Sequence, residues 1–419
     1  MKRRHDLLKK HGEPGGIKPP EGIEVIQLTA DEKQNASHIY MEAQIFFPDS
    51  KRFILHRSGT AHGGSDKNDP GHRYLLCDTE NRCSLEPVTE ETGATCPAVS
   101  PDGRYFYYFV DETEINKGRL TLKRIDFNNG RQKETLTVID RPFPATGTRP
   151  GRIYPLATIS SDGKKIGVQA FFGNGKKDNA PWGLMVFDTE KAGASLILHG
   201  QTWCNMHPQY CRSRDANFKR DILVQENHGN ICDREGRMNV LFSGRGADIH
   251  VIRDDGTNFR TMPWGRDGNE FCVGHECWRG REEWAISSVW YQNAKDVSLF
   301  ESMPVEDINH EGLNTPGGRR NNLSKNFKKP CFSHFATDAE GRLIVSDYNK
   351  THVFLGRLQE PGESPVANWT YLVNSCSSGS KKSHIHPFLS PDGKKVFFNS
   401  DETGTLQAYM VNGIENVRI

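Results

Sequence analysis

The stretch LSPDGKKVFFNSD, residues 389–401, combines a polar turn with an alternating apolar run. An Asp-Gly pair suits a tight turn, because aspartate bonds to its own backbone and glycine tolerates positive φ. The residues after the turn alternate with a period of two, as expected for a β-strand. The same turn and strand recur at six other places: FFPDSKRFIL from Phe46, VSPDGRYFYYFV from Val99, ISSDGKKIGVQAFF from Ile159, SRDANFKRDILVQE from Ser213, WRGREEWAISSVWY from Trp278 and ATDAEGRLIVSDY from Ala336.

The spacing of these copies predicts the fold. Successive turns are separated by roughly 50 to 60 residues, which is the length of one four-stranded propeller blade. A further strand follows six of the copies, in HRYLLCDTE, RLTLKRIDF, WGLMVFDTE, ADIHVIRDDG, THVFLGRL and LQAYMVNG. Amphipathic helical patterns are nearly missing, and the best candidate is the polar segment 5–10. We therefore predict an all-β, seven-bladed β-propeller that forms a single domain.

The two ends of the chain complete this prediction. Residues 23–29 have a strand pattern, and we expect them to pair with the last blade and close the ring, since closure removes exposed sheet edges. Residues 1–22 then form a polar N-terminal arm and residues 23–419 the propeller. The polar insertion 303–329, rich in Asn, Gly and Arg, is expected to be a loop.

Composition restricts the partners. The chain has 419 residues, of which 54 are Lys or Arg and 53 are Asp or Glu, so the formal charge of +1 argues against nucleic-acid and polybasic membrane binding. No apolar run approaches the length of a transmembrane helix, and the N-terminus lacks the apolar core of a secretory signal. The ten cysteines show no CxxC spacing, which favours reduced thiols. These features together predict a cytoplasmic protein.

Polar residues gather at the blade positions that meet near a propeller axis. The first strand of a blade precedes the turn and the second strand returns to the same face, so residues that begin the first strand or follow the second are expected to converge. Histidine is a minority residue, with 16 in the chain, yet it dominates these positions. The converging residues are His38, Arg149, Arg152, Tyr154, His207, Gln209, His228, His275, Glu276, His334, His384 and His386.

The pair His384 and His386 is the sharpest chemical signal. Residues i and i+2 of a strand face the same side, so both imidazoles can point at one ion. A third ligand from another blade, for which His275 is the best candidate, would leave positions open for water or substrate. Imidazole ligands suit Zn, Ni, Fe or Cu, and added oxygen ligands favour Mn.

The order and spacing of five signatures resemble those of the oligogalacturonate lyases, a family of cytoplasmic seven-bladed propellers that cleave pectin-derived oligouronides by β-elimination. The likeness is clearest from about Asn205 to the C-terminus, and the N-terminal half matches chiefly as blades. The signatures are HPQY at His207, ENHG and GRMN at His228 and Arg237, GHECW at His275, SHF at His334, and HIHPFLSPDGKKVFFNSD at His384.

The resemblance implies a role for each matching residue. It assigns His275, His384 and His386 to a divalent ion, Mn²⁺ in the family, with Zn²⁺, Ni²⁺ or Ca²⁺ as alternatives. It makes His228 the proposed base, supported by Arg237. It also places His207, Gln209, Arg237 and His334 around the sugar, and we expect Arg152 and Tyr154, which the blade positions bring to the same region, to bind substrate as well. One departure is that residues 379–383 replace a glutamine ligand of the family, and Cys211 and Cys277 inside matching motifs suggest a divergent member.

The implied reaction needs these residue types. Removing the C5 proton of a uronate requires that the adjacent carboxylate be neutralised, which a metal held by neutral histidines can do. It also requires a base with a pKa near neutrality, such as histidine. The 4-O leaving group needs a proton from water, Tyr154 or His334. The substrate would be a small anionic oligosaccharide and the product a 4,5-unsaturated uronate.

Other functions remain open from the sequence. A non-enzymatic propeller similar to TolB, with blades such as ADIHVIRDDGTNFR, would bind a protein partner and no metal. A hydrolase or an epimerase on the same scaffold would differ in its products. The chain has no GxSxG elbow, which disfavours a serine peptidase, whereas paired glycosidase carboxylates on two blades are compatible with the sequence.

Overall fold

The computed structural model describes residues 2–4, 18–61, 66–113, 115–243, 246–264, 270–291, 296–306, 320–360 and 368–417. The elements in these ranges are β-strands, apart from one 3-10 turn at Ile414–Asn416. None of the described residues forms a helix long and apolar enough to span a membrane. The predicted all-β class is therefore confirmed, whereas the candidate helix at 5–10 lies outside the described residues.

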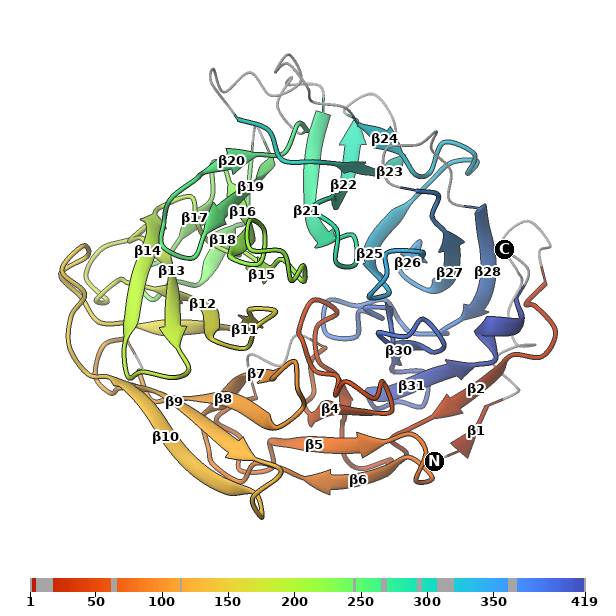
Figure 1. Cartoon of the computed structure of the whole chain (residues 1–419), viewed down its shortest axis with the longest axis horizontal. Coiled ribbons are helices and arrows are strands. Elements are labelled where there is room, and N and C mark those ends of the chain that lie inside the picture. Colours follow the sequence, from red (N-terminus) through yellow and green to blue (C-terminus); the bar gives the residue numbers. More distant parts are fainter. Residues whose placement is uncertain are drawn as a thin grey trace.

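The strands form antiparallel sheets arranged around a common centre, like the blades of a propeller (Figure 1). The first three sheets each contain four strands. The first consists of β3 (Ser37–His38), β4 (Arg52–Arg57), β5 (Arg73–Asp78) and β6 (Ser84–Pro87). The second consists of β7 (Ala94–Val99), β8 (Tyr105–Asp111), β9 (Leu120–Asp126) and β10 (Gln132–Ile139). The third consists of β11 (Arg152–Ile159), β12 (Lys165–Phe171), β13 (Trp182–Asp188) and β14 (Ala194–Gly200).

The middle of the chain forms a larger sheet, in which the single residue pair Ala247–Cys272 joins two groups of strands. The first group contains β15 (Gln209–Tyr210), β16 (Asp221–Asn227), β19 (Ala247–Arg253) and β20 (Arg260–Thr261). The second contains β21 (Glu270–Trp278), β22 (Ala285–Tyr291), β23 (Val297–Ser302) and β24 (Asn321–Asn322). A separate hairpin, β17 (Ile231–Cys232) and β18 (Met238–Val240), lies between β16 and β19 in sequence.

The last two sheets bring the chain back to its beginning. One consists of β25 (Phe332–Thr337), β26 (Leu343–Tyr348), β27 (His352–Arg357) and β28 (Asn368–Asn374). The other has the order β1 (Lys2–Arg3), β2 (Glu24–Gln27), β31 (Gln407–Asn412), β30 (Val396–Ser400) and β29 (Phe388–Leu389). The expected pairing of the N-terminal strand with the end of the chain is confirmed, because Val25 is in register with Val411.

All seven predicted turns connect two strands, or a β-bridge and a strand. In the copy at Ser100, the hydroxyl donates to Asp102 at 2.5 Å and accepts the amide of Tyr105 at 2.8 Å, which closes the turn. Gly103 has φ of 72°, the left-handed conformation that favours glycine. The turn therefore has the role that its sequence predicts, and it carries none of the candidate site residues.

The structure also contains strands that the sequence pattern did not predict. These include the short strands β1, β17, β18, β20 and β24, and β23, the third strand of its group. The outer strands β6, β10, β14 and β28 were expected only as the fourth strand of a blade, without a sequence stretch assigned to them. The insertion 303–329 was expected to be a loop, but its described end includes β24, which pairs with β23. Residues 307–319 of that insertion lie outside the described residues.

The expected polar arm is partly integrated into the last sheet. Lys2–Arg3 pairs with β2, and Arg4 is buried, with an ion pair to Glu402. Residues 5–17 of the expected arm lie outside the described residues.

The apolar core lies within and between neighbouring sheets. Phe53, Phe388 and Phe397, for example, are buried in one cluster that connects the first and last sheets. The first strands of neighbouring sheets also contact one another: β7 with β11, β11 with β15, β21 with β25, and β25 with β29. These strands lie nearest the common centre in Figure 1, so their side chains are the ones that meet there.

Candidate metal and active site

Five histidines from three sheets form a continuous cluster at the inner strands, which we call the histidine centre. His275 lies on β21 and His334 on β25, whereas His207 precedes β15 and the pair His384 and His386 precedes β29. The ring centroids of His207 and His275 are 6.4 Å apart, and those of His275 and His334 are 4.3 Å apart. These five of the residues that the sequence placed near the axis therefore lie together.

Three of these histidines are close enough to bind a single ion. One ring nitrogen from each of His334, His384 and His386 lies within 4.8 Å of the other two. Such spacing is compatible with three imidazoles around a metal at about 2.1 Å. The sequence had assigned His334 to the substrate and His275 to the metal. By this measure His334 is the third member of the group, and the ring of His275 lies beside it, tilted by 53°.

The predicted strand at His384 and His386 is absent. Residues 384–387 form no regular element, and His386 has φ of 41°, in the left-handed region. The two rings nevertheless lie 5.4 Å apart, nearly perpendicular to each other. An irregular backbone, and not the alternation of a strand, therefore brings the pair together.

Asp347 fixes the orientation of His334. Its Oδ2 accepts a hydrogen bond from His334 Nδ1 at 2.7 Å, and its Oδ1 accepts the backbone amides of Ser333 and His334 at 3.0 and 2.9 Å. His334 Nε2 is buried and has no hydrogen-bond partner among the described residues. A histidine whose Nδ1 is held by a carboxylate while Nε2 faces a cluster of ligands has the arrangement of a metal ligand.

Burial keeps the centre neutral. It lowers the pKa of His275 and of His334 well below the usual histidine value, and nearby imidazoles lower both further. The pKa of His384 is also lowered, again chiefly by burial. Burial raises the pKa of Asp347 to about 6, although the two backbone amides oppose this shift. Neutral imidazoles are the form that binds metal.

β-bulges in the innermost strands aim these side chains. The pairing of β21 with β22 shifts register between Cys272 and Glu276, and Gly274 within this interval has φ of 85°. A similar shift in β25 lies between Phe332 and Phe335 and includes His334. β-bulges commonly redirect side chains beside functional sites. Here His275 and Glu276, which are adjacent in sequence, both reach clusters near the centre.

A second group lies beside the histidine centre. His207 Nδ1 is 3.4 Å from Glu42 Oε1, and one ligand atom each of Glu42, His207 and Glu276 lies within 4.8 Å of the others. His207 Nε2 is 3.3 Å from the hydroxyl of Tyr154. Tyr40 packs against both His207 and His386, with ring centroids 5.2 and 4.6 Å away, so it connects the two groups.

Three further predicted site residues, Gln209, Arg152 and Arg237, are not members of either group of possible metal ligands. Gln209 is buried, and its side-chain amide donates to the carbonyl of Glu276 at 2.7 Å. Arg152 Nη1 lies 3.5 Å from the carbonyl of Gly236, and burial together with the nearby charge of Arg237 lowers its pKa. Arg237 is exposed and forms ion pairs with Asp233 and Glu235. Arg152 and Arg237 therefore approach each other at the hairpin β17–β18.

His228, the predicted base, follows directly after β16. Its Nε2 lies 2.7 Å from Asp248 Oδ2 on β19. It is not a member of the group formed by His334, His384 and His386. The structure thus gives His228 a carboxylate partner that the sequence did not identify.

Two further residues named from the sequence, His38 and Arg149, have contacts that support the fold. His38 is fully buried, its Nε2 is 2.9 Å from the carbonyl of Tyr409, and it packs against Phe53, Phe388 and Phe397. Arg149 bonds to backbone carbonyls of nearby loops, including that of Asp140 at 3.2 Å.

Sequence reasoning missed four residues of the two groups and their surroundings: Tyr40, Glu42, Asp347 and Asp248. Asp347 is the second-last residue of β26, at the end that returns to the centre, so the rule that found His228 also applied to it. Tyr40 and Glu42 lie between β3 and the first turn, in a segment with no repeated signature.

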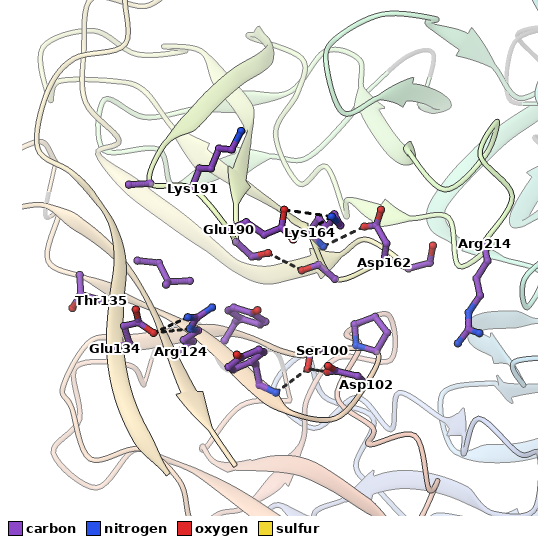
Figure 2. Close-up of a pocket in the computed structure, with 18 residues that line it drawn as sticks. Ser100, Asp102, Arg124, Glu134, Thr135, Asp162, Lys164, Glu190, Lys191 and Arg214 are labelled. Atoms are coloured by element: carbon purple, nitrogen blue, oxygen red, sulfur yellow. Dashed lines mark hydrogen bonds and ion pairs between the residues drawn. The ribbon is translucent and has the colours of Figure 1, made fainter. Parts of the chain in front are cut away.

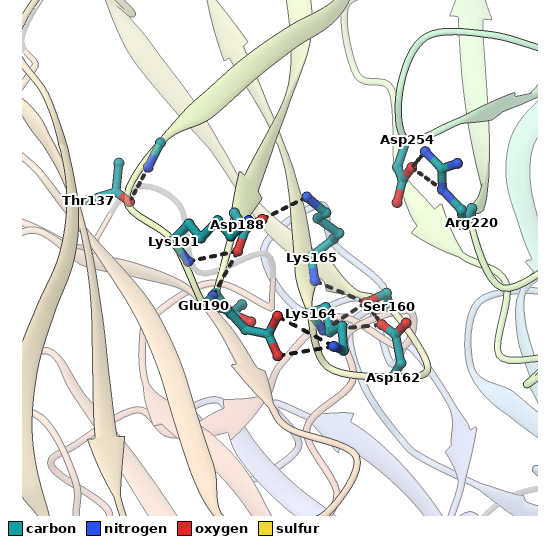
Figure 3. A network of polar contacts seen from close by, with 12 residues as sticks. Thr137, Ser160, Asp162, Lys164, Lys165, Asp188, Glu190, Lys191, Arg220 and Asp254 are labelled. Carbon is teal, nitrogen blue, oxygen red and sulfur yellow. Dashed lines mark hydrogen bonds and ion pairs between the residues drawn. The ribbon is translucent and has the colours of Figure 1, made fainter.

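A larger pocket lies away from both groups. It has a volume of about 730 Å³ and is lined by the turns and edges of the second and third sheets (Figure 2). Its charged side chains are largely paired, as in Arg124 with Glu134 at 2.8 Å and Lys164 with Glu190 at 3.1 Å. Figure 3 shows that this pairing continues through Lys165 and Asp188, 2.9 Å apart. We therefore place no active site in this pocket.

Comparison with solved structures identifies the fold. An oligogalacturonate lyase in complex with manganese matches with a TM-score of 0.68 and 18% identity, over 93% of this chain and 93% of that chain. The chain has the fold of the oligogalacturonate lyases. A second such lyase, from Vibrio parahaemolyticus, matches with a TM-score of 0.67 and 17% identity, over 96% of both chains.

The other comparisons add little to this likeness. TolB from Acinetobacter baumannii matches with a TM-score of 0.40 and 12% identity, over 78% of this chain and 68% of that chain. No protein-family model matches the chain, and no curated protein matches its sequence. The resemblance to the oligogalacturonate lyases, predicted from short signatures, is thus confirmed at the level of the fold.

Proposed function

We propose that the chain is a metal-dependent lyase that cleaves oligogalacturonate or a related oligouronide by β-elimination, with a 4,5-unsaturated uronate as product. The observation that carries this proposal is the group of His334, His384 and His386, whose nitrogens lie within 4.8 Å of one another. It occurs in a fold shared with oligogalacturonate lyases, one of which was solved with manganese.

The proposal includes a complete architecture of seven blades. In it, the weakly joined eight-stranded sheet consists of two blades, and β2 closes the ring by its pairing with β31. The propeller domain would span 23–419, with 1–22 as an N-terminal extension. The absence of disulfides among the ten cysteines, all of which lie in the described residues, supports a reducing, cytoplasmic location.

The residues present fit a divalent ion. His334 supplies a buried nitrogen without a hydrogen-bond partner, and its neutral imidazole is oriented by Asp347. His384 and His386 complete the group, with His275 next to it as a further candidate ligand. Three imidazoles accept Mn²⁺, Zn²⁺ or Ni²⁺. The manganese in the similar lyase favours Mn²⁺ here.

A bound divalent ion would neutralise the uronate carboxylate next to the C5 proton. His228 would take that proton. Its hydrogen bond to Asp248 keeps the Nε2 proton in place, so that Nδ1 carries the lone pair. Asp248 would also stabilise the imidazolium that forms.

The other predicted residues would bind substrate and return a proton. Arg152 and Arg237 approach each other at the hairpin β17–β18 and suit the carboxylates of neighbouring sugar units. Burial raises the pKa of Tyr154, so its phenol stays protonated and can donate to the 4-O leaving group. His207 bonds to this phenol and would hold it in place.

The test is turnover of short oligogalacturonates, followed by the ultraviolet absorbance of the conjugated product. We expect activity that a chelator removes and Mn²⁺ restores, and that falls at least about 1,000-fold in the variant His384→Ala/His386→Ala. His199→Ala, an exposed histidine on β14, serves as the control and should retain full activity. Unchanged turnover in the double variant would refute the proposal. A TolB-like binding protein would show neither turnover nor bound metal, and a hydrolase would release saturated products.

A further inference from the structure

The group of Glu42, His207 and Glu276 shares only His207 with the histidine centre and forms a separate set of possible ligand atoms. It brings together the first sheet and both strand groups of the eight-stranded sheet: Glu42 follows β3, His207 precedes β15, and Glu276 lies on β21. The three side chains are buried, with exposed fractions of 5%, 4% and 0%. One ligand atom from each lies within 4.8 Å of the other two.

The buried ligand atoms of this cluster lack hydrogen-bond partners. Among the described residues, neither carboxylate oxygen of Glu42, neither carboxylate oxygen of Glu276, nor His207 Nδ1 makes a hydrogen bond. The closest polar approach is the one of 3.4 Å between His207 Nδ1 and Glu42 Oε1. Buried carboxylates are almost always compensated by hydrogen bonds, by a cation or by a proton. This cluster therefore needs a partner that the side chains do not supply.

The charges around the cluster call for a cation. Burial raises the pKa of Glu42 well above its usual value, and the guanidinium of Arg212 opposes this shift. Burial, and after it the negative charge of Glu42, raise the pKa of Glu276 well above its usual value, whereas His207 opposes the shift. The two carboxylates thus repel each other across a short distance, with a single histidine between them and a guanidinium on one side only.

His207 is oriented as a ligand of this cluster. Its Nδ1 faces the carboxylates, and its Nε2 lies 3.3 Å from the hydroxyl of Tyr154. With the proton on Nε2, the imidazole donates to the Tyr154 oxygen and presents the Nδ1 lone pair to the carboxylates. A second hydrogen bond of this kind, which fixes the tautomer, is usual for histidines that bind metals.

We propose that Glu42, His207 and Glu276 form a second divalent-cation site, distinct from the site at His334, His384 and His386. Two carboxylates and one imidazole provide harder ligands than three imidazoles, which favours Mn²⁺ at this position. The cation would connect the first sheet with the two halves of the eight-stranded sheet across the centre. Its role is to stabilise the inner strands. Ring contacts of Tyr40 with His207 and His386, and of His207 with His275, connect this site to the other histidines of the centre.

The test measures Mn²⁺ in a background that lacks the first site. The variant His384→Ala/His386→Ala is stripped with chelator, incubated with MnCl₂ alone, desalted and analysed for metal per chain. We expect this background to retain one equivalent of Mn²⁺, and the further substitutions Glu42→Gln and Glu276→Gln to remove it. Glu226→Gln in the same background is the matched control, because Glu226 is also a partly buried glutamate next to a histidine. It should leave the bound Mn²⁺ unchanged.

Thermal unfolding provides a second readout that separates metal binding from simple structural damage. Without metal, the Glu42→Gln/Glu276→Gln variant should unfold at the same temperature as its parent or higher, because uncompensated charges are removed. With Mn²⁺ about a hundredfold above Kd, the parent protein should gain about 3 °C in unfolding temperature, and the variant should gain nothing.

Two results would overturn the proposal: a background without retained Mn²⁺, or retained Mn²⁺ that survives both glutamine substitutions. A pair of carboxylates that merely share a proton would give the first result and no thermal shift. The proposed lyase activity is tested separately by turnover, and failure of the first metal site would appear as equal Mn²⁺ binding in the wild type and in His384→Ala/His386→Ala. That outcome leaves the comparison of the glutamate variants intact.

Discussion

At the scale of single residues, Asp347 has the greatest influence on the histidine centre without belonging to it. It binds two backbone amides and the imidazole of His334, so it holds both the local backbone and the ring. The resulting tautomer leaves the lone pair on Nε2, which is buried and has no hydrogen-bond partner among the described residues. Partners of this kind typically contribute 10- to 100-fold, in rough terms, to metal affinity.

We therefore predict that Asp347→Asn weakens Mn²⁺ binding by about 10- to 100-fold, because an amide can donate to Nδ1 and stabilise the wrong tautomer. Titration calorimetry on metal-free protein measures this affinity. Asp248→Asn is the control, since it breaks the other Asp–His pair of the same length, between Asp248 and His228. It should slow turnover and leave Mn²⁺ affinity unchanged. Equal losses of affinity in the two variants would contradict the assignment.

The sequence predicted much of the histidine centre and little of its support. His275, His334, His384 and His386 could be predicted from the sequence because each lies on or just before the strand that leads into a recurrent turn. Glu42 was not, since its segment repeats no signature and its partners lie more than a hundred residues away. The left-handed backbone of His386 was also beyond the pattern, because only the packed neighbours enforce such a conformation.

At the scale of elements, the β-bulges of the first strands determine which side chains reach the centre. Register shifts occur where β7, β11, β21 and β25 pair with the following strand. Alternation with a period of two predicts the strands correctly but gives opposite directions to adjacent residues such as His275 and Glu276. The two-residue strand β24 is too short and too polar to show a period-two alternation, so the sequence did not predict it.

The pair β16–β19 contains a contact that should make stability depend on pH. Burial opposes ionisation of Glu226, but hydrogen bonds from His250 and Thr202 outweigh it and lower its pKa to about 2. A lowered carboxyl pKa stabilises the fold above the unfolded value near 4.5, and this contribution disappears as the pH falls towards 2.

We predict that Glu226→Gln destabilises the protein by about 2 kcal/mol at pH 7 and that this difference shrinks progressively between about pH 4.5 and pH 2. Urea unfolding of the two proteins at a series of pH values measures the difference. Glu86→Gln, whose side chain is about half exposed, is a suitable control, because its ion pair with Arg131 should contribute little. A Glu226→Gln difference that is constant across this pH range would rule out the linkage.

At the scale of the whole molecule, the pairing of β2 with β31 joins residues almost four hundred positions apart. If β2 closes the ring, as we propose, its loss opens one sheet and affects every neighbouring contact in turn. If it is only an edge strand, it can fray while the remaining sheets stay folded. Val25 is a good probe, because it is fully buried in the cluster of the last two sheets and in register with Val411.

We expect Val25→Ala to lower the free energy of unfolding by about 2 kcal/mol, from lost apolar burial and the cavity that remains. Val138→Ala makes the same change on the outer strand β10, where the side chain is 39% exposed, and should change stability by at most about 0.5 kcal/mol. Ring closure further requires that Val25→Ala shift the unfolding of the entire molecule in a single transition, monitored by both tryptophan fluorescence and circular dichroism. An early, separate transition of small amplitude, with an unchanged main midpoint, would instead show that β2 is a peripheral strand and that the blades hold together without it.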